Sequence, residues 1–385
     1  MKVAVTTLAF CVTSLLALGL VMLYSASMTQ VGTHYLIMQL IWCAFGFVFC
    51  VAAAVIDYAK LKVLVWPLFG FSLVLLILVL LPLPHDITKK INGAHRWFRL
   101  PGMRLQPSEL GKIAFILALA WYGDRFQRRM HTFRWGIGGP LLIIGSMLGV
   151  IFIEPDWGTT ILLASVGGAI LLLAGVQWKF IIPPVVLGVS GLAAFLIHNP
   201  LRMKRIFSWL DLEEHKKDVG YQAYQAMIAL GSGGWTGLGL GNGRQKLGWV
   251  PEHHTDFIFS IIGEELGLAA TLLVILAFVV IALCGLYIAL HARETFGTLL
   301  ATGITLLISL QAAINIGVVT SALPNKGLAL PFISYGGSNL LAMLTCVGLL
   351  LSIARHAEPG RVSAPEFAGN DALPGKRNPF GAKAS

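Results

Sequence analysis

Asp256 is the residue of this chain that is best placed for acid–base chemistry. It stands near the end of the run Pro251 to Phe257, where a polar loop passes directly into a long apolar segment. A carboxylate held between water and a low-dielectric region can act as a general base, and positioned bases contribute about 10²–10⁴-fold to a rate. The N-cap of the following helix also fits this position, and the two roles are compatible.

Glu109 and Lys112 form a second polar pair, at the start of another apolar segment. They lie three residues apart, a spacing that places both side chains on one face of a helix. Polar groups at membrane depth cost about 2.5–3.5 kcal/mol each, which makes them functional candidates. Either the two residues form a structural ion pair, or Lys112 faces an anionic ligand.

Further cations lie in the loops between apolar segments. Loop 84–106 either contacts lipid phosphates or forms a pocket for an anionic ligand outside the membrane. The last part of loop 198–256 contributes two more candidate cations, and the segment 323–338 contributes one and is expected to be a re-entrant loop buried in protein. These basic residues are Lys89, Lys90, Arg96, Arg99 and Arg104 in the first loop, Arg244 and Lys246 in the second, and Lys326 in the third segment.

Other polar segments permit narrower expectations. Residues 201–217 mix apolar and basic side chains and are typical of a helix lying in the membrane interface. The glycine-rich stretch 231–241 lacks the spacing of a P-loop, so close backbone packing is the preferred interpretation. Asp156, in the short turn after Glu154-Pro155, either caps the next helix or contacts substrate. His253, His254 and Asp256 are a weak metal-binding pattern, and we assign no metal ligand.

The elements that must position these residues are membrane-spanning helices. The chain has 385 residues, of which 56% are apolar and only 12% are charged, whereas a soluble chain carries about 25% charged residues. This composition excludes an ordinary soluble enzyme and a disordered protein. The formal charge of +10 does not indicate nucleic-acid binding, because the basic residues stand between long apolar runs. The five cysteines all lie within apolar runs and are expected to be small core residues.

The apolar runs predict an all-α polytopic protein with about ten transmembrane helices and a large extracytoplasmic loop between spans seven and eight. The run 257–291 is expected to be one helix whose first turns are lined by protein, with two crossings around 263–267 as the alternative. An even number of spans, with very short loops that lack Lys and Arg, favours both termini being cytoplasmic. The expected spans are 3–27, 35–56, 63–83, 107–123, 136–153, 159–176, 180–197, 257–291, 296–320 and 336–354. Residues 1–355 form the transmembrane domain, and 356–385 a disordered cytoplasmic tail.

At several of these positions the sequence resembles the SEDS family (shape, elongation, division and sporulation proteins). The similarity runs from about residue 1 to 355, and it is closer to the division member of the family than to the elongation member. Asn325 and His254 depart from the common pattern without touching the presumed chemistry. The matching pieces are Asn92-Gly93-Ala94-His95-Arg96-Trp97, Gln106-Pro107-Ser108-Glu109-Leu110, Gly239-Leu240-Gly241-Asn242 with Arg244-Gln245-Lys246-Leu247, Pro251 to Phe259, Gly263-Glu264-Glu265-Leu266-Gly267 and Pro331 to Ser338.

The resemblance implies a peptidoglycan glycosyltransferase that polymerises lipid II at the outer face of the bacterial cytoplasmic membrane during cell division. It assigns the motif Asp to Asp256, as general base, and the motif Trp to Trp97, as a substrate contact. It also implies a class B penicillin-binding transpeptidase and other division proteins as partners, and a location at the septum.

The residues agree with that chemistry, because one base and several cations suffice when the leaving group is a diphosphate. A divalent cation, Mg²⁺ or Mn²⁺, could assist, although no ligand cluster commits the chain to any cofactor. A transporter or flippase of lipid-linked precursors is the alternative function, since charged residues within broken helices suit that class as well. A non-catalytic scaffold is a third possibility, but it leaves the intramembrane charges unexplained. The predicted substrate-binding residues are Trp97, Arg96, Glu109, Lys112, Arg244, Lys246 and Lys326.

Overall fold

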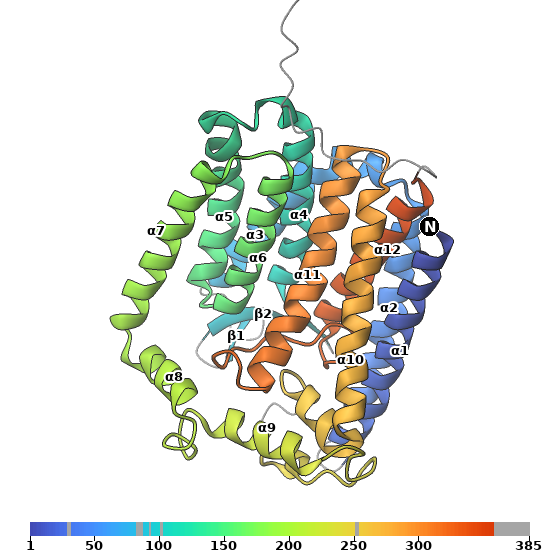
Figure 1. Ribbon diagram of the computed structural model, residues 1–385, viewed down its shortest axis with the longest axis vertical. Helices are drawn as coiled ribbons and strands as arrows, with labels where there is room; N and C mark the ends of the chain where they lie inside the picture. The colour runs from blue at the N-terminus through green and yellow to red at the C-terminus, as the bar shows by residue number, and fades with distance from the viewer. Residues whose placement is uncertain (29–31, 82–87, 92–93, 101–102, 251–253, 358–385) are drawn as a thin grey trace, which may run out of the picture.

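The computed structural model describes residues 1–28, 32–81, 88–91, 94–100, 103–250 and 254–357, which form a bundle of long helices (Figure 1). The α-helices are α1 (Lys2–Ser27), α2 (His34–Val55), α3 (Leu61–Leu80), α4 (Pro107–Phe126), α5 (Gly139–Ile153), α6 (Trp157–Leu173), α7 (Trp178–Ile197), α8 (Pro200–Leu210), α9 (Tyr221–Ser232), α10 (Ile258–Leu290), α11 (Thr295–Val319) and α12 (Gly337–Arg355). Short turns of 3₁₀ or π geometry are η1 (Tyr58–Lys60), η2 (Gln127–Arg129), η3 (Arg134–Gly138) and η4 (Gln245–Leu247).

The centre of the bundle is formed by α4, α11 and α12, whose side chains are buried on most of their faces. Helix α12 lies along α2, α10 lies between α1 and α11, and α4 packs against α3, α6 and α11. Small residues allow close approach, as membrane helices require: a Cβ atom at Gly303 would lie 2.6 Å from Cγ2 of Ile116. Helix α7 is at the periphery, and Ile181 is its one buried residue.

All ten predicted spans coincide with helices, but not all of these helices are long and apolar enough to be assigned as membrane-spanning. Eight of the described helices are long and apolar enough to cross a membrane. Helix α6, with 17 residues, is shorter, and α4 carries four charged residues. The all-α polytopic class is therefore confirmed, whereas the count of ten crossings stays a prediction. The tail, which was predicted to be disordered from residue 356, lies almost entirely outside the described residues.

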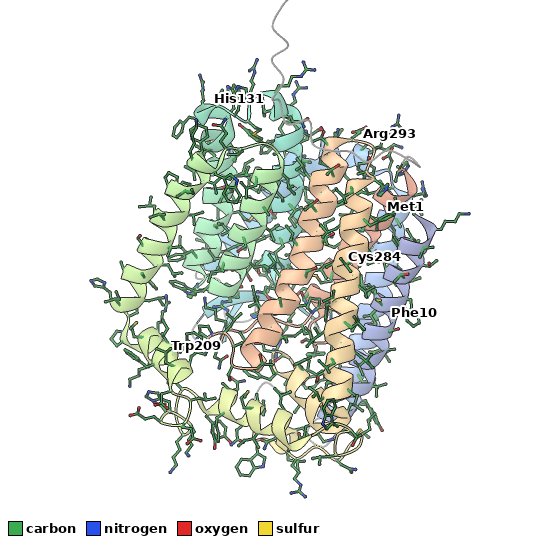
Figure 2. All side chains as sticks on the ribbon, viewed as in Figure 1. Met1, Phe10, His131, Trp209, Cys284 and Arg293 are labelled. Atoms are coloured by element: carbon green, nitrogen blue, oxygen red, sulfur yellow. The ribbon has the colours of Figure 1, made fainter. Side chains whose placement is uncertain are left out.

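The two ends of the bundle differ in what they carry. Figure 2 shows Met1, His131 and Arg293 at one end and Trp209 toward the other. The end of α12 lies at the same end as the N-terminus, while α8 and α9 lie at the opposite end (Figure 1). Helix α8 is amphipathic, as its sequence predicted, and Nε1 of Trp209 donates to the carbonyl oxygen of Ser321 over 2.9 Å. This bond ties α8 to the segment that follows α11.

A small antiparallel sheet forms where the sequence predicted only a basic loop. Its strands are β1 (Thr88–Ile91), β2 (Ala94–Leu100) and β3 (Met103–Leu105), in the order β1-β2-β3. Phe98 pairs with Leu105. Aromatic and apolar residues in β2 favour extended backbone, but the charges of this segment obscured that signal in the sequence. The sheet places β2 beside α3 and α4.

Helix α10 is interrupted at Gly267, where the prediction of one continuous helix is wrong. The backbone there has φ 78° and ψ −175°, a conformation that glycine adopts readily. A Cβ atom at Gly263 would lie 3.4 Å from Cγ2 of Thr271, eight residues further on, so the chain folds back at this point. The segment before the break is buried from Phe257 to Glu265, as expected for turns lined by protein.

Candidate active site

A cavity of about 1130 Å³ gathers residues from many separate parts of the chain. Its walls come mainly from the start of α2, strand β2, the start of α4, the start of α6, and the segments 254–257, 325–329 and 335–339, with further residues from β3, α8, α9 and α11. These parts lie up to about 300 positions apart in the sequence, between His34 and Asn339. The cavity is polar and charged although the chain around it is apolar.

Five of the eight predicted site residues line this cavity, and three do not. Asp256, Trp97, Arg96, Glu109 and Lys326 are in its wall. Lys112, Arg244 and Lys246 are absent from the wall as the structure describes it. Sequence reasoning did not single out several other lining residues, among them His34, Tyr35, Arg205, Gln222 and Gln311.

Asp256 lies two residues before α10, whose N-cap position is Phe257, so the alternative that Asp256 is the N-cap of this helix is wrong. Its carboxylate lies against the backbone of Gly327, where a Cβ atom would collide with Oδ2. Asn315, on α11, donates from Nδ2 to the carbonyl oxygen of Asp256 over 2.8 Å and to that of Leu328 over 2.6 Å. The carboxylate is therefore packed against a glycine, and its backbone is tied to the facing segment.

The segment that carries Lys326 is hydrogen-bonded to the residues before Asp256. Ser334 donates from Oγ to the carbonyl oxygen of Thr255 over 2.6 Å, and the backbone N–H of Tyr335 donates to that of His254 over 3.0 Å. The ring of Tyr35 stacks on His254 with centroids 4.9 Å apart and lies 4.7 Å from the ring of Tyr335. These contacts form one aromatic wall of the cavity and hold the two segments together.

Gln311 and Asn315 form a polar ladder on one face of α11, because they are four residues apart. Both side chains are buried. Gln311 accepts a hydrogen bond from Nζ of Lys112 over 2.9 Å and donates to the carbonyl oxygen of Ala329 and to Oδ1 of Asn339. The signal that could have found them is two amides one helical turn apart within an apolar span.

Lys112 supports the cavity from behind. Its Nζ lies 2.7 Å from Oε2 of Glu109, and its side chain is 1% exposed. Glu109 itself lines the cavity. The geometry therefore favours the structural ion pair over a ligand-facing Lys112, because the amine is already held by Glu109 and Gln311.

Lys246 is likewise buried in a structural cluster away from the cavity. Its Nζ lies 2.7 Å from Oε1 of Glu265, 3.0 Å from Oγ of Ser25 and 2.8 Å from the carbonyl oxygen of Gly241. Burying a carboxylate is costly unless it is paired and hydrogen-bonded, and Glu265 is fully buried. The lysine is therefore held in place by the acid.

Arg244 is anchored by its backbone, and its side chain is exposed. Its N–H donates to Oε1 of Glu264 over 2.7 Å. The adjacent glycine-rich stretch packs closely on the break in α10, as the sequence indicated: the N–H groups of Leu238 and Gly239 donate to the carbonyl oxygens of Glu264 and Glu265 over 3.0 Å. These bonds satisfy carbonyl groups that the interruption of the helix leaves without helical partners.

The turn before α6 caps that helix and also accepts hydrogen bonds from Arg96. Asp156 accepts from the N–H and the Oγ1 of Thr159, over 3.3 and 2.9 Å, and so caps α6. Arg96 donates from Nε to the carbonyl oxygen of Glu154 over 2.9 Å and from Nη2 to that of Pro155 over 2.6 Å. Asp156 also lines the cavity, so capping and contact with a ligand are compatible.

The charges of the cavity are mixed. Its cations are Arg96, Arg104, Arg205 and Lys326, and its carboxylates are Glu109, Asp156 and Asp256. Burial lowers the pKa of Lys326 from its ordinary value, and the nearby carboxylate of Asp156 opposes that change. In the described part of the chain no three His, Cys, Asp or Glu side chains are grouped to hold a metal ion, and His253 lies outside that part. A divalent cation thus stays a prediction without a ligand set.

The fold and the cavity define a polytopic membrane protein with a charged site between its helices and the segments that connect them. The family model described as "Cell cycle protein", which covers FtsW, RodA and SpoVE, matches residues 6–359. The chain belongs to this family, the SEDS family of the sequence resemblance.

Curated relatives and solved structures agree with this assignment. A protein of Trichlorobacter lovleyi named "Probable peptidoglycan glycosyltransferase FtsW" is 40% identical over 349 residues, which cover 89% of this chain and 91% of the relative. A protein of the same name from Coxiella burnetii is 41% identical over 360 residues, covering 90% and 95%.

Among solved structures, a chain from a peptidoglycan synthase complex that coordinates polymerization and crosslinking has a TM-score of 0.74 and 27% identity, covering 90% of this chain and 96% of that one. The rod shape determining protein RodA of Thermus thermophilus has a TM-score of 0.67 and 27% identity, with 90% and 95% covered. In both cases the similarity covers nine-tenths of this chain.

Proposed function

We propose that this protein is a peptidoglycan glycosyltransferase that polymerises lipid II into glycan strands during cell division. The observation that carries the proposal is the position of Asp256, whose carboxylate lines a cavity shared with Arg96, Lys326 and Trp97. The names of the relatives from Trichlorobacter lovleyi and Coxiella burnetii support the same activity.

In this reaction Asp256 accepts the proton of the acceptor sugar hydroxyl while that oxygen attacks the donor sugar carbon. The bond from this carbon to the diphosphate breaks, and its electron pair leaves with the diphosphate. A single base with direct attack implies inversion at the donor carbon. No general acid is required, because a diphosphate is stable as an anion.

The leaving diphosphate needs positive charge aimed at it in a site that excludes bulk water. Arg96 is suited to this task because two backbone carbonyl groups orient its guanidinium, and an oriented charge needs no rearrangement during the reaction. Lys326 is a second suitable cation. It lines the cavity beside Gly327, against which the carboxylate of Asp256 packs. Trp97 offers an aromatic face on which a sugar ring can stack.

The remaining assignments follow from this activity. The protein lies in the bacterial cytoplasmic membrane with both termini in the cytoplasm, its cavity opens on the outer side, and it works at the division septum. A class B penicillin-binding transpeptidase cross-links the strands that it makes. The synthase complex that contains a structural neighbour of this chain supports such a partnership.

The decisive experiment incubates the purified protein with lipid II in detergent and separates the products by length. Asp256→Asn keeps the size of the side chain, so the folded yield should be normal while polymerisation falls by about 10²-fold or more. Asp211→Asn is the matched control, because Asp211 is exposed and outside the cavity wall, and it should polymerise normally. Translocation of lipid II in liposomes without any polymer would instead identify a flippase.

A further inference from the structure

Glu154 is a buried carboxylic acid directly behind the cavity wall. It stands between α5 and α6, and its side chain is 0% exposed. Neither Oε1 nor Oε2 has a hydrogen-bond partner within the part of the chain that the structure describes. Buried carboxylates normally have such partners, so an acid without them is costly when ionised and needs a reason.

Two charged groups act on this acid. Arg96, from strand β2, donates to the backbone carbonyl oxygens of Glu154 and Pro155, and so its guanidinium is oriented by the backbone of the turn. Asp156 follows two residues later as the cap of α6. Burial raises the pKa of Glu154 to about 8; the charge of Asp156 adds to this increase, and Arg96 opposes it.

The two states of Glu154 leave Arg96 with different electrostatic surroundings. When the acid is protonated, the positive charge of Arg96 has no neighbouring counter-charge from Glu154 and acts fully on an anion in the cavity. When the acid is ionised, its negative charge offsets part of that attraction. Because Arg96 also lines the cavity, the protonation of Glu154 reaches any ligand bound there.

We propose that Glu154 is a positioning residue that sets how strongly Arg96 attracts a diphosphate in the cavity, and that a diphosphate binds together with a proton taken up by Glu154. This inference rests on the proposed function, since it takes a lipid-linked diphosphate as the ligand. The proton comes from solvent and is held on the carboxyl group of Glu154 until the anion leaves.

Isothermal titration calorimetry of the full chain in detergent tests the proposal. The probe is a diphosphodiester, N-acetylglucosamine joined through diphosphate to a short isoprenyl chain, which has no proton of its own to exchange near neutral pH. Titrations in two buffers of different ionisation enthalpy at about pH 8 give the number of protons taken up. If the bound anion favours protonation about tenfold, the complex takes up about 0.4 proton, and affinity falls about eightfold between pH 6.5 and 9.5.

The lysine in the cavity, Lys326, also has a lowered pKa, so the comparison is made in a Lys326→Arg background, where that side chain stays charged. In this background Glu154→Gln keeps the shape of the side chain and remains neutral, so it should bind at pH 6.5 like its parent and lose both the proton uptake and the decrease in affinity. Glu294→Gln is the matched control, because Glu294 pairs with Lys62 outside the cavity wall and should leave both signals unchanged.

Absence of proton uptake by the unaltered protein would overturn the proposal without any variant, and so would uptake that is equal with and without Glu154→Gln in the Lys326→Arg background. Binding is measured separately from polymerisation. A protein that shows Glu154-dependent binding but makes no polymer would refute the proposed function alone, whereas a protein that polymerises normally and binds without proton uptake would refute this inference alone.

Discussion

Asn315 holds the backbone of Asp256 through a hydrogen bond of 2.8 Å from its Nδ2 to the aspartate carbonyl oxygen. The same amide nitrogen donates to the carbonyl oxygen of Leu328 over 2.6 Å. One buried side chain of α11 therefore sets the distance between the segment that carries the acid and the segment that carries Lys326 and Gly327.

Replacing Asn315 with Leu should separate folding from catalysis. The variant leaves two buried carbonyl groups without this donor, at a cost of about 1–3 kcal/mol for each unsatisfied group. We expect a lower melting temperature and a decrease of at least about tenfold in the turnover of the protein that remains folded, because misplacing a base is costly. Asn242→Leu is the control, since Asn242 donates to a carbonyl group of an exposed loop. Normal turnover of folded Asn315→Leu would limit Asn315 to a role in stability.

Lys246→Met should destabilise the protein without acting on the chemistry. Removing the lysine leaves Glu265 buried without its cation, and breaking a buried ion pair costs about 3–5 kcal/mol. The double variant with Glu265→Gln should recover most of the melting temperature, because the uncompensated charge is gone. Turnover per folded molecule should stay close to normal in both. If Lys246→Met retains full stability but fails to polymerise, the lysine contacts substrate after all.

Trp97 gives a direct test of sugar stacking in the cavity. Trp97→Phe keeps an aromatic face and should retain most of the activity, whereas Trp97→Ala should raise KM and lower polymerisation by about tenfold, as expected when a stacking contact worth about 1.4 kcal/mol is lost. Expression and membrane insertion should be equal in the two variants. Equal activity of both variants, with a difference only in yield, would instead assign Trp97 to anchoring at the membrane interface.

The alkaline side of the pH–rate profile should depend on Lys326. Burial lowers the pKa of this amine, the neighbouring cations Arg202 and Arg205 lower it further, and Asp156 opposes them. A lysine is positive below its pKa, so a lowered pKa means that the charge is lost at a lower pH than for an exposed lysine. Lys326→Arg stays charged throughout and should move the decline in activity to higher pH. An identical alkaline limb in both proteins would exclude Lys326 from binding the diphosphate.

The helical bundle was predictable because a long apolar run in a membrane can form little other than a spanning helix. Every expected span coincides with a helix. The break at Gly267 was not, because apolar residues continue on both sides of it and a periodicity argument cannot detect a single left-handed glycine. The sheet around Trp97 was also missed, since the charged residues of strand β2 resemble a solvated loop.

Charge type was easier to predict than side-chain direction. Asp256, Arg96 and Lys326 reach the cavity as expected, but Lys112 and Lys246 are held by buried acids. Nothing in the sequence around Lys246 says that Glu265, nineteen residues later, is folded back onto it. Gln311 and Asn315 were overlooked because neutral amides carry no charge to draw attention, although in an apolar span they are equally unusual.

The salt bridge between Lys246 and Glu265 also helps to fix the position of Asp256 relative to α1. Together with the hydroxyl group of Ser25 it joins α1, the glycine-rich stretch and the bend at Gly267 into one block, and only the short helical segment before Gly267 separates Asp256 from that block. Helices in bilayers tilt when the thickness of the lipid changes. Because Asp256 is fastened to α1 through this block and to α11 through Asn315, we expect its position relative to these two helices to change little between one lipid composition and another.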